Sequence, residues 1–442
     1  MNTIDFFDSE LSFEKVNAEK LYDCRENCFM ALYRDVAFAG AEQWLNELES
    51  NGFKTVQHNE NNGNVFDLLE RDGLHITALY TPCDSSLRVT AGENPVPPNA
   101  EAKCSGSSGT VFYGFENDHT YIDCGMCLLV QCPDNSFFVV DSGHYFQFND
   151  NDRIHKFMRD RTPKGEKIVV SGWLITHAHS DHISKLMDFL KYNCDDVVIE
   201  GFYSNLMDPK YDVDGDWDDE EVLLSLKLFR QLDGLDIPKY KLHSGMRFTL
   251  RNLSFEVLCT HEDHFPSKVP DYNDSSCAVM MSVGGTKVFI PGDASALSSA
   301  VLEARYGETL RCDVVQVAHH GHGGLSKRAY EFLGARIAVF PITRIMFDEE
   351  YPKLEANRRL IEIAEKYFIT SDGTVCIPLP LKTEDIKVLP DETFEDFAKI
   401  KNQWGYSYSD ERIDELYEIY KKNGGDLNKE VLPVKKEGFS LR

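Results

Sequence analysis

Four potential metal ligands within six residues constrain this chain more than any other feature. They are His177, His179, Asp181 and His182. The preceding stretch, residues 167–176, is apolar and rich in β-branched side chains, which predicts a buried strand. Residues 183–190 place apolar side chains at helical spacing, so the four lie on a strand-to-helix turn. Three imidazoles and a carboxylate suit zinc, and also iron or manganese. A chance cluster of surface histidines is the alternative, and the apolar lead-in argues against it.

A further carboxylate ends an apolar hairpin upstream. Residues 126–132 and 137–143 predict two strands joined by Pro-Asp-Asn-Ser, and the second contains Asp141. By itself Asp141 would indicate a turn cap. A buried carboxylate needs partners, however, and metal-bound imidazoles supply them. Given its spacing to His177, we favour a supporting role for Asp141 beneath the metal site.

Three more motifs follow in order. Residues 272–282 contain Asn273 and Ser276, a predicted strand over residues 286–291 ends at Gly292-Asp293, and residues 313–324 carry the pair His319-His320 before a glycine. The series H-x-H-x-D-H, N-x-x-S, G-D and H-H-G resembles the metallo-β-lactamase superfamily. It is most similar to a branch that includes the hydrolase-like domains of bacterial DNA-uptake channel proteins and a choline-phosphate esterase.

The resemblance implies an αββα sandwich with two divalent ions, zinc first and manganese or iron as alternatives. One ion would take His177, His179 and a bridging Asp293. The other would take Asp181, His182, His320 and Asp293. Two such ions make a hydroxide available at neutral pH and stabilise negative charge on the reacting group. The resemblance also implies that Asp181 orients the nucleophile and that His319 contacts a substrate oxyanion or supports the site. His322 is a candidate general acid, with an ordinary loop histidine as the alternative.

The chain departs from the pattern at two places. Many relatives carry another histidine ligand before the bridging aspartate, where this chain offers Asn273 and Ser276. We expect Asn273 or Asp274 to line the site, and give the nearby His261 and His264 less weight. The glycine pair that usually follows the signature is replaced by Ser184-Lys185, and Lys185 is expected on an exposed helix face.

The composition of the chain limits which classes of partner and substrate we expect. The formal net charge of −27 disfavours nucleic acid, because a phosphate backbone would be repelled at long range. No apolar run approaches the roughly 20 residues that span a bilayer, and the acidic start is unlike a secretory signal. The twelve cysteines are scattered and favour buried thiols in a reducing cytoplasm, with Cys124-x-x-Cys127 interpreted as structural. We therefore expect a cytoplasmic protein with a small-molecule substrate, and an oligomer is open.

The chain divides by composition into four parts. Residues 1–92 predict a small α+β domain, 93–107 a linker rich in proline and glycine, 108–380 the hydrolase-like α/β domain, and 381–442 a helical extension. Within the first part we expect a loosely helical stretch over 14–33, then a helix over 41–53. Strands are expected at 53–57, 64–71, 74–80 and 87–90. The acidic stretch 208–221 hints at calcium, but a solvated surface loop is favoured.

The sequence therefore predicts a metal-dependent hydrolase that acts on a phosphodiester or another phosphate-containing small molecule. Hydrolysis of an ester, lactone or amide is the alternative within enzymes. A non-catalytic metal-binding scaffold is the alternative outside them, because the third-ligand segment is altered.

Overall fold

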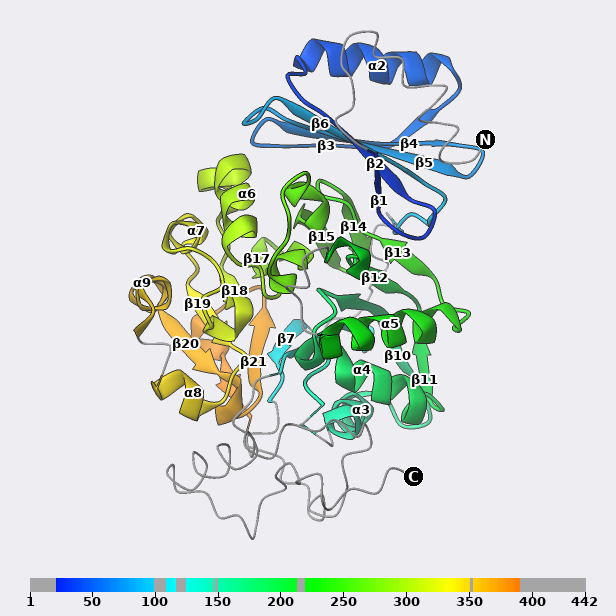
Figure 1. Cartoon of the computed structure of the whole chain (residues 1–442). Coiled ribbons are helices and arrows are strands. Elements are labelled where there is room, and N and C mark those ends of the chain that lie inside the picture. Colours follow the sequence, from blue (N-terminus) through cyan, green and yellow to red (C-terminus); the bar gives the residue numbers. More distant parts are fainter. Residues whose placement is uncertain are drawn as a thin grey trace.

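The computed structural model describes residues 21–98, 109–116, 125–145, 147, 150–212, 219–349 and 353–389. Three sheets organise these residues (Figure 1). The expected linker lies partly outside the described residues. So does the expected helical extension, of which residues 381–389 are described, and Cys124 lies outside them as well. The ten described cysteines are free thiols. Among the described residues, no helix combines the length and the apolar character needed to cross a bilayer.

The first sheet, here called the N-terminal sheet, is antiparallel throughout, in the order β1-β2-β6-β5-β4-β3. Its elements are β1 (Leu21–Asp23), β2 (Phe29–Tyr33), α2 (Phe38–Ser50), β3 (Lys54–Asn61), β4 (Asn64–Arg71), β5 (Leu74–Thr81) and β6 (Ser86–Gly92). The predicted helix and the four predicted strands that follow it are confirmed. The helical interpretation of residues 21–33 is wrong, because this segment is the hairpin β1–β2.

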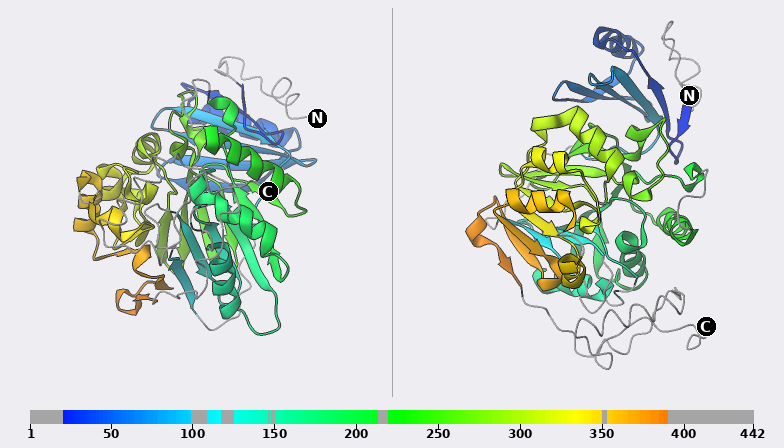
Figure 2. Two further views of the ribbon diagram at one scale, coloured as in Figure 1. Left: turned by 60° about the horizontal axis from the view of Figure 1, so that its bottom comes forward. Right: turned by 60° about the vertical axis from the view of Figure 1, so that its left-hand side comes forward.

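The two faces of the N-terminal sheet pack differently. Helix α2 covers one face, where Trp44 and Leu48 bury against Leu69 and Ile76. The other face carries Phe66, which packs into the central core of the rest of the molecule. Figure 1 and Figure 2 show the sheet between α2 and that larger body. Alternation of side chains across each strand makes this two-sided burial possible.

Two larger sheets form the rest of the described chain, here called the sandwich. One has the order β13-β12-β10-β9-β8-β7-β21-β22, with β11 pairing β10, and the other runs β14-β15-β16-β17-β18-β19-β20. The strands of the first are β7 (Thr110–Gly114), β8 (Cys127–Gln131), β9 (Phe137–Asp141), β10 (Ile168–Ile175), β11 (Val197–Ile199), β12 (Phe202–Ser204), β13 (Lys239–Lys241), β21 (Val375–Leu379) and β22 (Lys387–Val388). Those of the second are β14 (Arg247–Leu250), β15 (Leu253–Cys259), β16 (Ala278–Val283), β17 (Thr286–Ile290), β18 (Val314–Gln316), β19 (Ile337–Phe340) and β20 (Lys366–Ile369).

Helices cover the outer faces of both sheets, which makes the sandwich a layered α/β structure as predicted. Helices α3 (Asp150–Arg161), α4 (Ser180–Tyr192) and α5 (Asp219–Asp233) pack on the first sheet. Helices α6 (Ala296–Tyr306), α7 (Lys327–Leu333) and α9 (Glu355–Ile363) pack on the second, and α8 (Arg344–Glu349) also lies on that side. Leu174 points into the core between the sheets whereas Trp173 points to the helices, as strand geometry requires.

Helix α4 also corrects an expectation. Lys185 is 1% exposed rather than solvated, and its Nζ lies 2.6 Å from the Asp188 carboxylate. A buried ammonium needs such a partner, so Lys185 belongs to the packed face of the helix.

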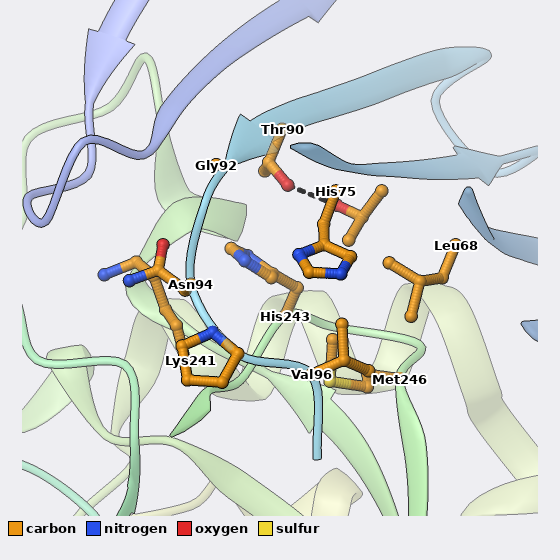
Figure 3. A pocket seen from close by; sticks show the side chains of 11 residues that line it. Leu68, His75, Thr90, Gly92, Asn94, Val96, Lys241, His243 and Met246 are labelled. Atoms are coloured by element: carbon orange, nitrogen blue, oxygen red, sulfur yellow. Dashed lines mark hydrogen bonds between the residues drawn. The ribbon is translucent and has the colours of Figure 1, made fainter. Parts of the chain in front are cut away.

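The N-terminal sheet meets the sandwich over polar contacts as well as apolar ones. Asn59 Nδ2 donates to the carbonyl oxygen of Gly245 at 3.0 Å, and Asn64 Nδ2 donates to that of Arg305 at 2.9 Å. Arg305 and Arg88 both approach the buried carboxylate of Asp263. A small recess of about 20 Å³ remains in this junction (Figure 3).

Candidate metal centre

Parallel strands carry the candidate ligands to one edge of the sandwich. Strands β9 and β10 run parallel in the first sheet, and β17 and β18 run parallel in the second. The carboxyl ends of parallel strands meet at the same edge, where α/β proteins place their ligands. His177 and His179 follow β10, Asp293 follows β17, and His320 follows β18. Asp181 and His182 lie in the first turn of α4.

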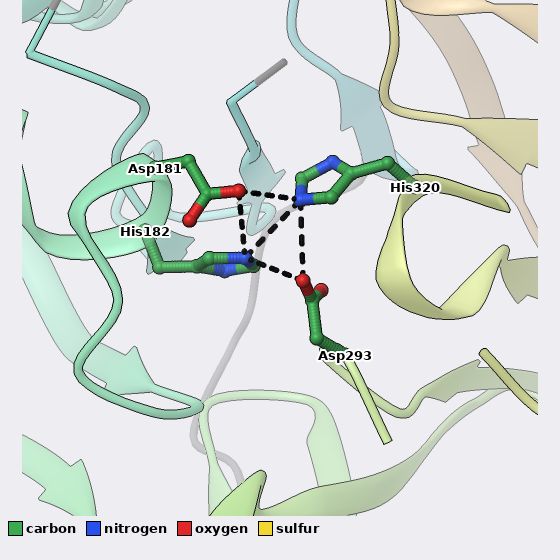
Figure 4. A group of neighbouring side chains, drawn as sticks. All are labelled: Asp181, His182, Asp293 and His320. Atoms are coloured by element: carbon green, nitrogen blue, oxygen red, sulfur yellow. Dashed lines mark hydrogen bonds and ion pairs between the residues drawn. The ribbon is translucent and has the colours of Figure 1, made fainter. Parts of the chain in front are cut away.

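Four of these side chains converge, and we call them the metal cluster. They are Asp181, His182, Asp293 and His320, each offering one ligand atom within 4.8 Å of the others (Figure 4). The Nε2 atoms of His182 and His320 are 3.2 Å apart. The Oδ2 atom of Asp293 lies 3.2 Å from His182 Nε2 and 3.3 Å from His320 Nε2, and Asp181 Oδ2 lies 3.0 Å from His320 Nε2.

The outer ring nitrogens fix which atoms face inward. His182 Nδ1 donates to Asp141 Oδ2 at 2.7 Å, and His320 Nδ1 donates to the Pro341 carbonyl oxygen at 2.7 Å. A neutral imidazole that donates from one nitrogen presents a lone pair on the other. Both Nε2 lone pairs therefore point at the same place as two carboxylates. This donor set fits a divalent cation, because imidazole nitrogens and carboxylate oxygens are the ligands that such ions take in proteins.

Asp141 supports the site from beneath through several contacts. Its carboxylate accepts from His182 Nδ1, from the Thr176 backbone N–H at 2.9 Å and from Thr176 Oγ1 at 2.7 Å. Thr176 Oγ1 in turn accepts from His177 Nδ1 at 3.1 Å. One buried carboxylate thus orients two imidazoles, directly for His182 and through a hydroxyl for His177.

Burial and charge pull the titrating groups in opposite directions. Burial disfavours the charged form of every member, but the histidines hold the pKa values of Asp181 and Asp293 well below the usual range. Burial likewise opposes protonation of His320, yet Asp293 and Asp181 raise its pKa to about 10. Without a cation, protons on the rings would balance the carboxylates. A metal ion bound there would take the place of those protons, so its binding would release them.

The second half of the predicted site is less complete. His177 Nε2 lies 3.1 Å from His179 Nδ1, and the His177 and His182 rings have centroids 4.2 Å apart. The pair therefore adjoins the metal cluster. Asn273 has its Nδ2 3.3 Å from His319 Nε2. The amide thus lies beside the rim histidine.

The expectation that Asp274 lines the site is wrong. Its carboxylate accepts from the backbone N–H groups of Ser295, Leu297 and Ser298 and from the Ser295 hydroxyl, so it caps the start of α6. A carboxylate at a helix N-terminus satisfies donors that have no partner within the helix. The two histidines with less weight also point elsewhere: His261 Nδ1 bonds to the Asn205 carbonyl oxygen and His264 Nε2 to the Asp274 carbonyl oxygen.

Backbone strain concentrates at the candidate ligands and their support. Asp141, His319 and His320 have φ values of 52°, 51° and 52°, in the left-handed region that side chains disfavour. Such strain of about 1–3 kcal/mol per residue persists where the surroundings over-determine the conformation. Gly292 also has a positive φ of 60°, and a Cβ there would lie 2.8 Å from the Thr176 side chain. A glycine is therefore required directly before Asp293.

His319 and His322 form the rim of the site. His319 is partly buried, and burial lowers the pKa of its ring. The His322 ring centroid lies 5.6 Å from that of His319. Neither belongs to the metal cluster. His144, another histidine near the site in sequence, packs against Tyr145 in a tilted arrangement with ring centroids 4.1 Å apart.

Two supporting residues were not anticipated. Glu221 accepts from both the backbone N–H and the hydroxyl of Ser180, at 2.7 and 2.6 Å, which anchors the first turn of α4. Glu221 ends the acidic stretch that we expected to be a solvated loop, so that expectation is wrong at this residue; residues 213–218 lie outside the described chain. Gln316 clamps Gly292 by donating to its carbonyl oxygen and accepting from its N–H. Glu221 and Gln316 are ordinary residue types outside any recognised motif, so their supporting roles could not be predicted from the sequence.

No family model and no curated protein matches this sequence. Solved structures with a similar chain course include three proteins. They are the metallo-β-lactamase fold protein YhfI from Bacillus subtilis (12% identity, TM-score 0.34, 59% of this chain and 95% of that one), Zn²⁺-bound PqqB from Methylobacterium extorquens (13%, 0.36, 61% and 100%) and a diphosphatase of the PhnP family (14%, 0.36, 61% and 98%).

Proposed function

We propose that this chain is a metal-dependent hydrolase that acts on a phosphodiester or another phosphate-containing small molecule. The carrying observation is the metal cluster, in which two oriented imidazole nitrogens and two carboxylates converge in a buried site. Divalent ions held there would supply hydroxide near neutral pH and stabilise negative charge on the reacting group. We propose two ions, with His177 and His179 serving the second.

The surrounding residues suit defined roles in that reaction. Asp181 is the partly exposed member of the metal cluster, so its carboxylate is placed to orient the attacking water. The Asn273 amide donates one N–H to His319 Nε2, which leaves its second N–H and the His319 Nδ1–H as rim donors that suit the oxygens of a tetrahedral phosphate group. His322, on the same loop, is our candidate to protonate the leaving group. The preference for phosphate rests on the H-H-G resemblance and on these donors.

A second candidate follows from one specific observation. Among the described residues, the metal cluster is the one group of ligand atoms that lie close enough together to hold a metal ion. In that part of the chain, His177 and His179 contact each other without a third ligand side chain of their own. A chain that holds one ion and acts on carboxylic esters or lactones, or that binds without turnover, would have this arrangement.

The test combines metal content with turnover. Metal per chain is measured in purified full-length protein, and hydrolysis of bis(p-nitrophenyl) phosphate is compared in wild type, Asp181→Ala and His182→Ala. His155→Ala is the matched control, since His155 pairs with Asp196 on the outer helix layer. About two ions per chain, with turnover that both site variants lose and the control keeps, would support the proposal. Two ions without phosphodiester turnover would redirect the search to esters and lactones. Little metal after reconstitution would overturn the proposal.

A further inference from the structure

A second buried polar cluster lies at the junction of the N-terminal sheet and the sandwich, away from the metal cluster. We call it the thiol cluster: Cys24, Cys28, Lys241, His243 and Glu262. The two cysteines belong to the β1–β2 hairpin, and the other three to the sandwich. All five side chains are buried, with Cys24 2% and Cys28 1% exposed. None of them has a part in the proposed hydrolysis.

The cluster contains a relay of a thiol, an imidazole and a carboxylate. His243 Nδ1 lies 2.8 Å from Glu262 Oε2, and the same ring is hydrogen-bonded to the side chain of Cys28. A base that contacts a potential nucleophile and is itself oriented by a third group is the arrangement that activates thiols. Lys241, also buried, adds a positive charge beside the pair.

The second thiol is placed to form a disulfide with the first. The β1–β2 ladder ends at the pair Asp23 and Phe29, and Cys24 and Cys28 extend it by one pair, with the Cys24 N–H donating to the Cys28 carbonyl oxygen at 2.8 Å. Opposite residues on paired antiparallel strands have Cα atoms about 4.5–5.5 Å apart. Disulfides span Cα distances of about 4.4–6.8 Å. The hairpin therefore presents two cysteines on one face at bridging distance.

The recess in the junction reaches the imidazole of this relay. The recess is lined by His243, Lys241, His75, Asn94 and Gly92. Figure 3 shows the His75 and His243 rings turned into it. Gly92 separates the recess from the thiol, since a Cβ there would lie 3.3 Å from Cys28 Sγ. The absence of a side chain at Gly92 leaves the sulfur directly behind the lining.

We propose that Cys28 is a thiolate that reacts with small hydroperoxides, and that Cys24 resolves the product to an intrachain disulfide. Cys28 sulfur attacks one oxygen of hydrogen peroxide; the S–O bond forms, the O–O bond breaks, and the leaving hydroxide takes a proton from His243 to become water. Cys24 sulfur then attacks Cys28 Sγ, displacing hydroxide, which takes the Cys24 proton. Two thiols and one peroxide thus give one disulfide and two waters.

The charges of the cluster favour the first step. The hydrogen bond from Cys24 is the strongest influence, and with His243 and Lys241 it outweighs burial and lowers the pKa of Cys28 to about 6. Cys83, an exposed residue in the turn after β5, has the opposite setting, because partial desolvation of its sulfur and the nearby Asp84 raise the pKa of its thiol. Thiolate character and not exposure should therefore decide which thiol oxidises first.

The chain carries a built-in readout for the disulfide. Trypsin cleaves after Lys20, Arg25 and Arg34, so it separates Cys24 from Cys28 into the peptides 21–25 and 26–34. In full-length protein treated with hydrogen peroxide, alkylated and digested, we expect these two peptides to stay joined until a reductant is added. Oxidation of Cys83 before this pair, or an unjoined pair under excess peroxide, would overturn the proposal.

Variants and a pH profile separate the two thiols. Cys28→Ser should abolish the joined peptides, Cys24→Ser should stop at a sulfenic acid that dimedone traps, and Cys83→Ser should behave as wild type. The pH profile is measured on wild-type protein. The rate of Cys28 alkylation should be half-maximal near the pKa of its thiol, about 6. A midpoint at the ordinary thiol value, or thiols that react only after a chelator removes a metal, would overturn the proposal.

Discussion

The metal cluster and the thiol cluster are both buried and charged, yet they balance their charges differently. In the metal cluster each outer ring nitrogen is already committed as a donor, to Asp141 or to the Pro341 carbonyl oxygen, so the inner nitrogens and carboxylates face one another as acceptors. In the thiol cluster the His243 ring lies between two acidic groups, the Glu262 carboxyl and the Cys28 thiol. The first arrangement suits a cation from outside, whereas in the second a protonated His243 supplies the positive charge.

The largest expected effect comes from removing the acceptor shared by both predicted ions. Asp293→Asn keeps the shape of the side chain but removes its charge. Loss of an outer partner of a ligand costs about 10–100-fold, and loss of a ligand should exceed that, so we expect turnover to fall more than about 100-fold with a drop in bound metal. Metal analysis and steady-state kinetics check this. Asp195→Asn, an exposed aspartate after α4, is the control, and equal metal content in both variants would contradict the assignment.

The thiol cluster should instead control stability, with a defined pH window. Despite burial, His243 lowers the pKa of Glu262 to about 2, and Glu262 with Cys28 raises the pKa of His243 to about 10. The Glu262 contribution is complete above its ordinary value of 4.5 and is lost as pH falls toward 2. The His243 contribution is complete below 6.5 and is lost as pH rises toward 10. The pair therefore stabilises most between these ordinary values.

Glu262→Gln tests that window. Removing one partner of a buried ion pair costs about 3–5 kcal/mol, and we expect this loss of unfolding free energy near pH 5.5, with a smaller loss near pH 9. Urea unfolding of wild type and variant at both pH values measures it. A difference that is the same at both would show that the charge of His243 is not involved.

Added metal should stabilise the fold through one cluster and not the other. A ligand that binds only the folded state adds about 2.7 kcal/mol at 100 times its Kd. We expect zinc to raise the melting temperature of wild type and of Cys28→Ser equally, and to have little effect on His182→Ala. Thermal unfolding with and without zinc checks this. A zinc effect that disappears in Cys28→Ser would place a metal in the thiol cluster.

The sequence predicted the parts of this molecule in which neighbours along the chain act together. The strand-to-helix turn after β10 carries four candidate ligands within six residues, so its local pattern was sufficient. The β1–β2 hairpin was missed because its turn, Arg25-Glu26-Asn27, takes three positive φ values without a glycine to signal them. Asp274 was misassigned because an aspartate serves equally as a ligand or as a helix cap.

The remaining contacts could not be predicted from the sequence, because only tertiary packing brings their residues together. His243 and Cys28 are separated by more than half of the described chain and meet only when the N-terminal sheet docks on the sandwich. Glu221 reaches Ser180 from α5 across the helix layer. Neither pair has a spacing or a residue pattern from which the contact could be predicted.

The finest test of the metal cluster concerns the relay from Asp141 to His177. Thr176→Val removes the hydroxyl that links them but retains the side-chain shape and the backbone bond from the Thr176 N–H to Asp141. His182 keeps its direct bond to Asp141, so only the ion assigned to His177 and His179 should weaken, by about 10-fold. Zinc titration should then separate one weakened site from one unchanged site, and Thr176→Ser should restore both. Equal weakening of the two sites would mean that Thr176 supports the loop as a whole and that the two halves of the centre are not independently held.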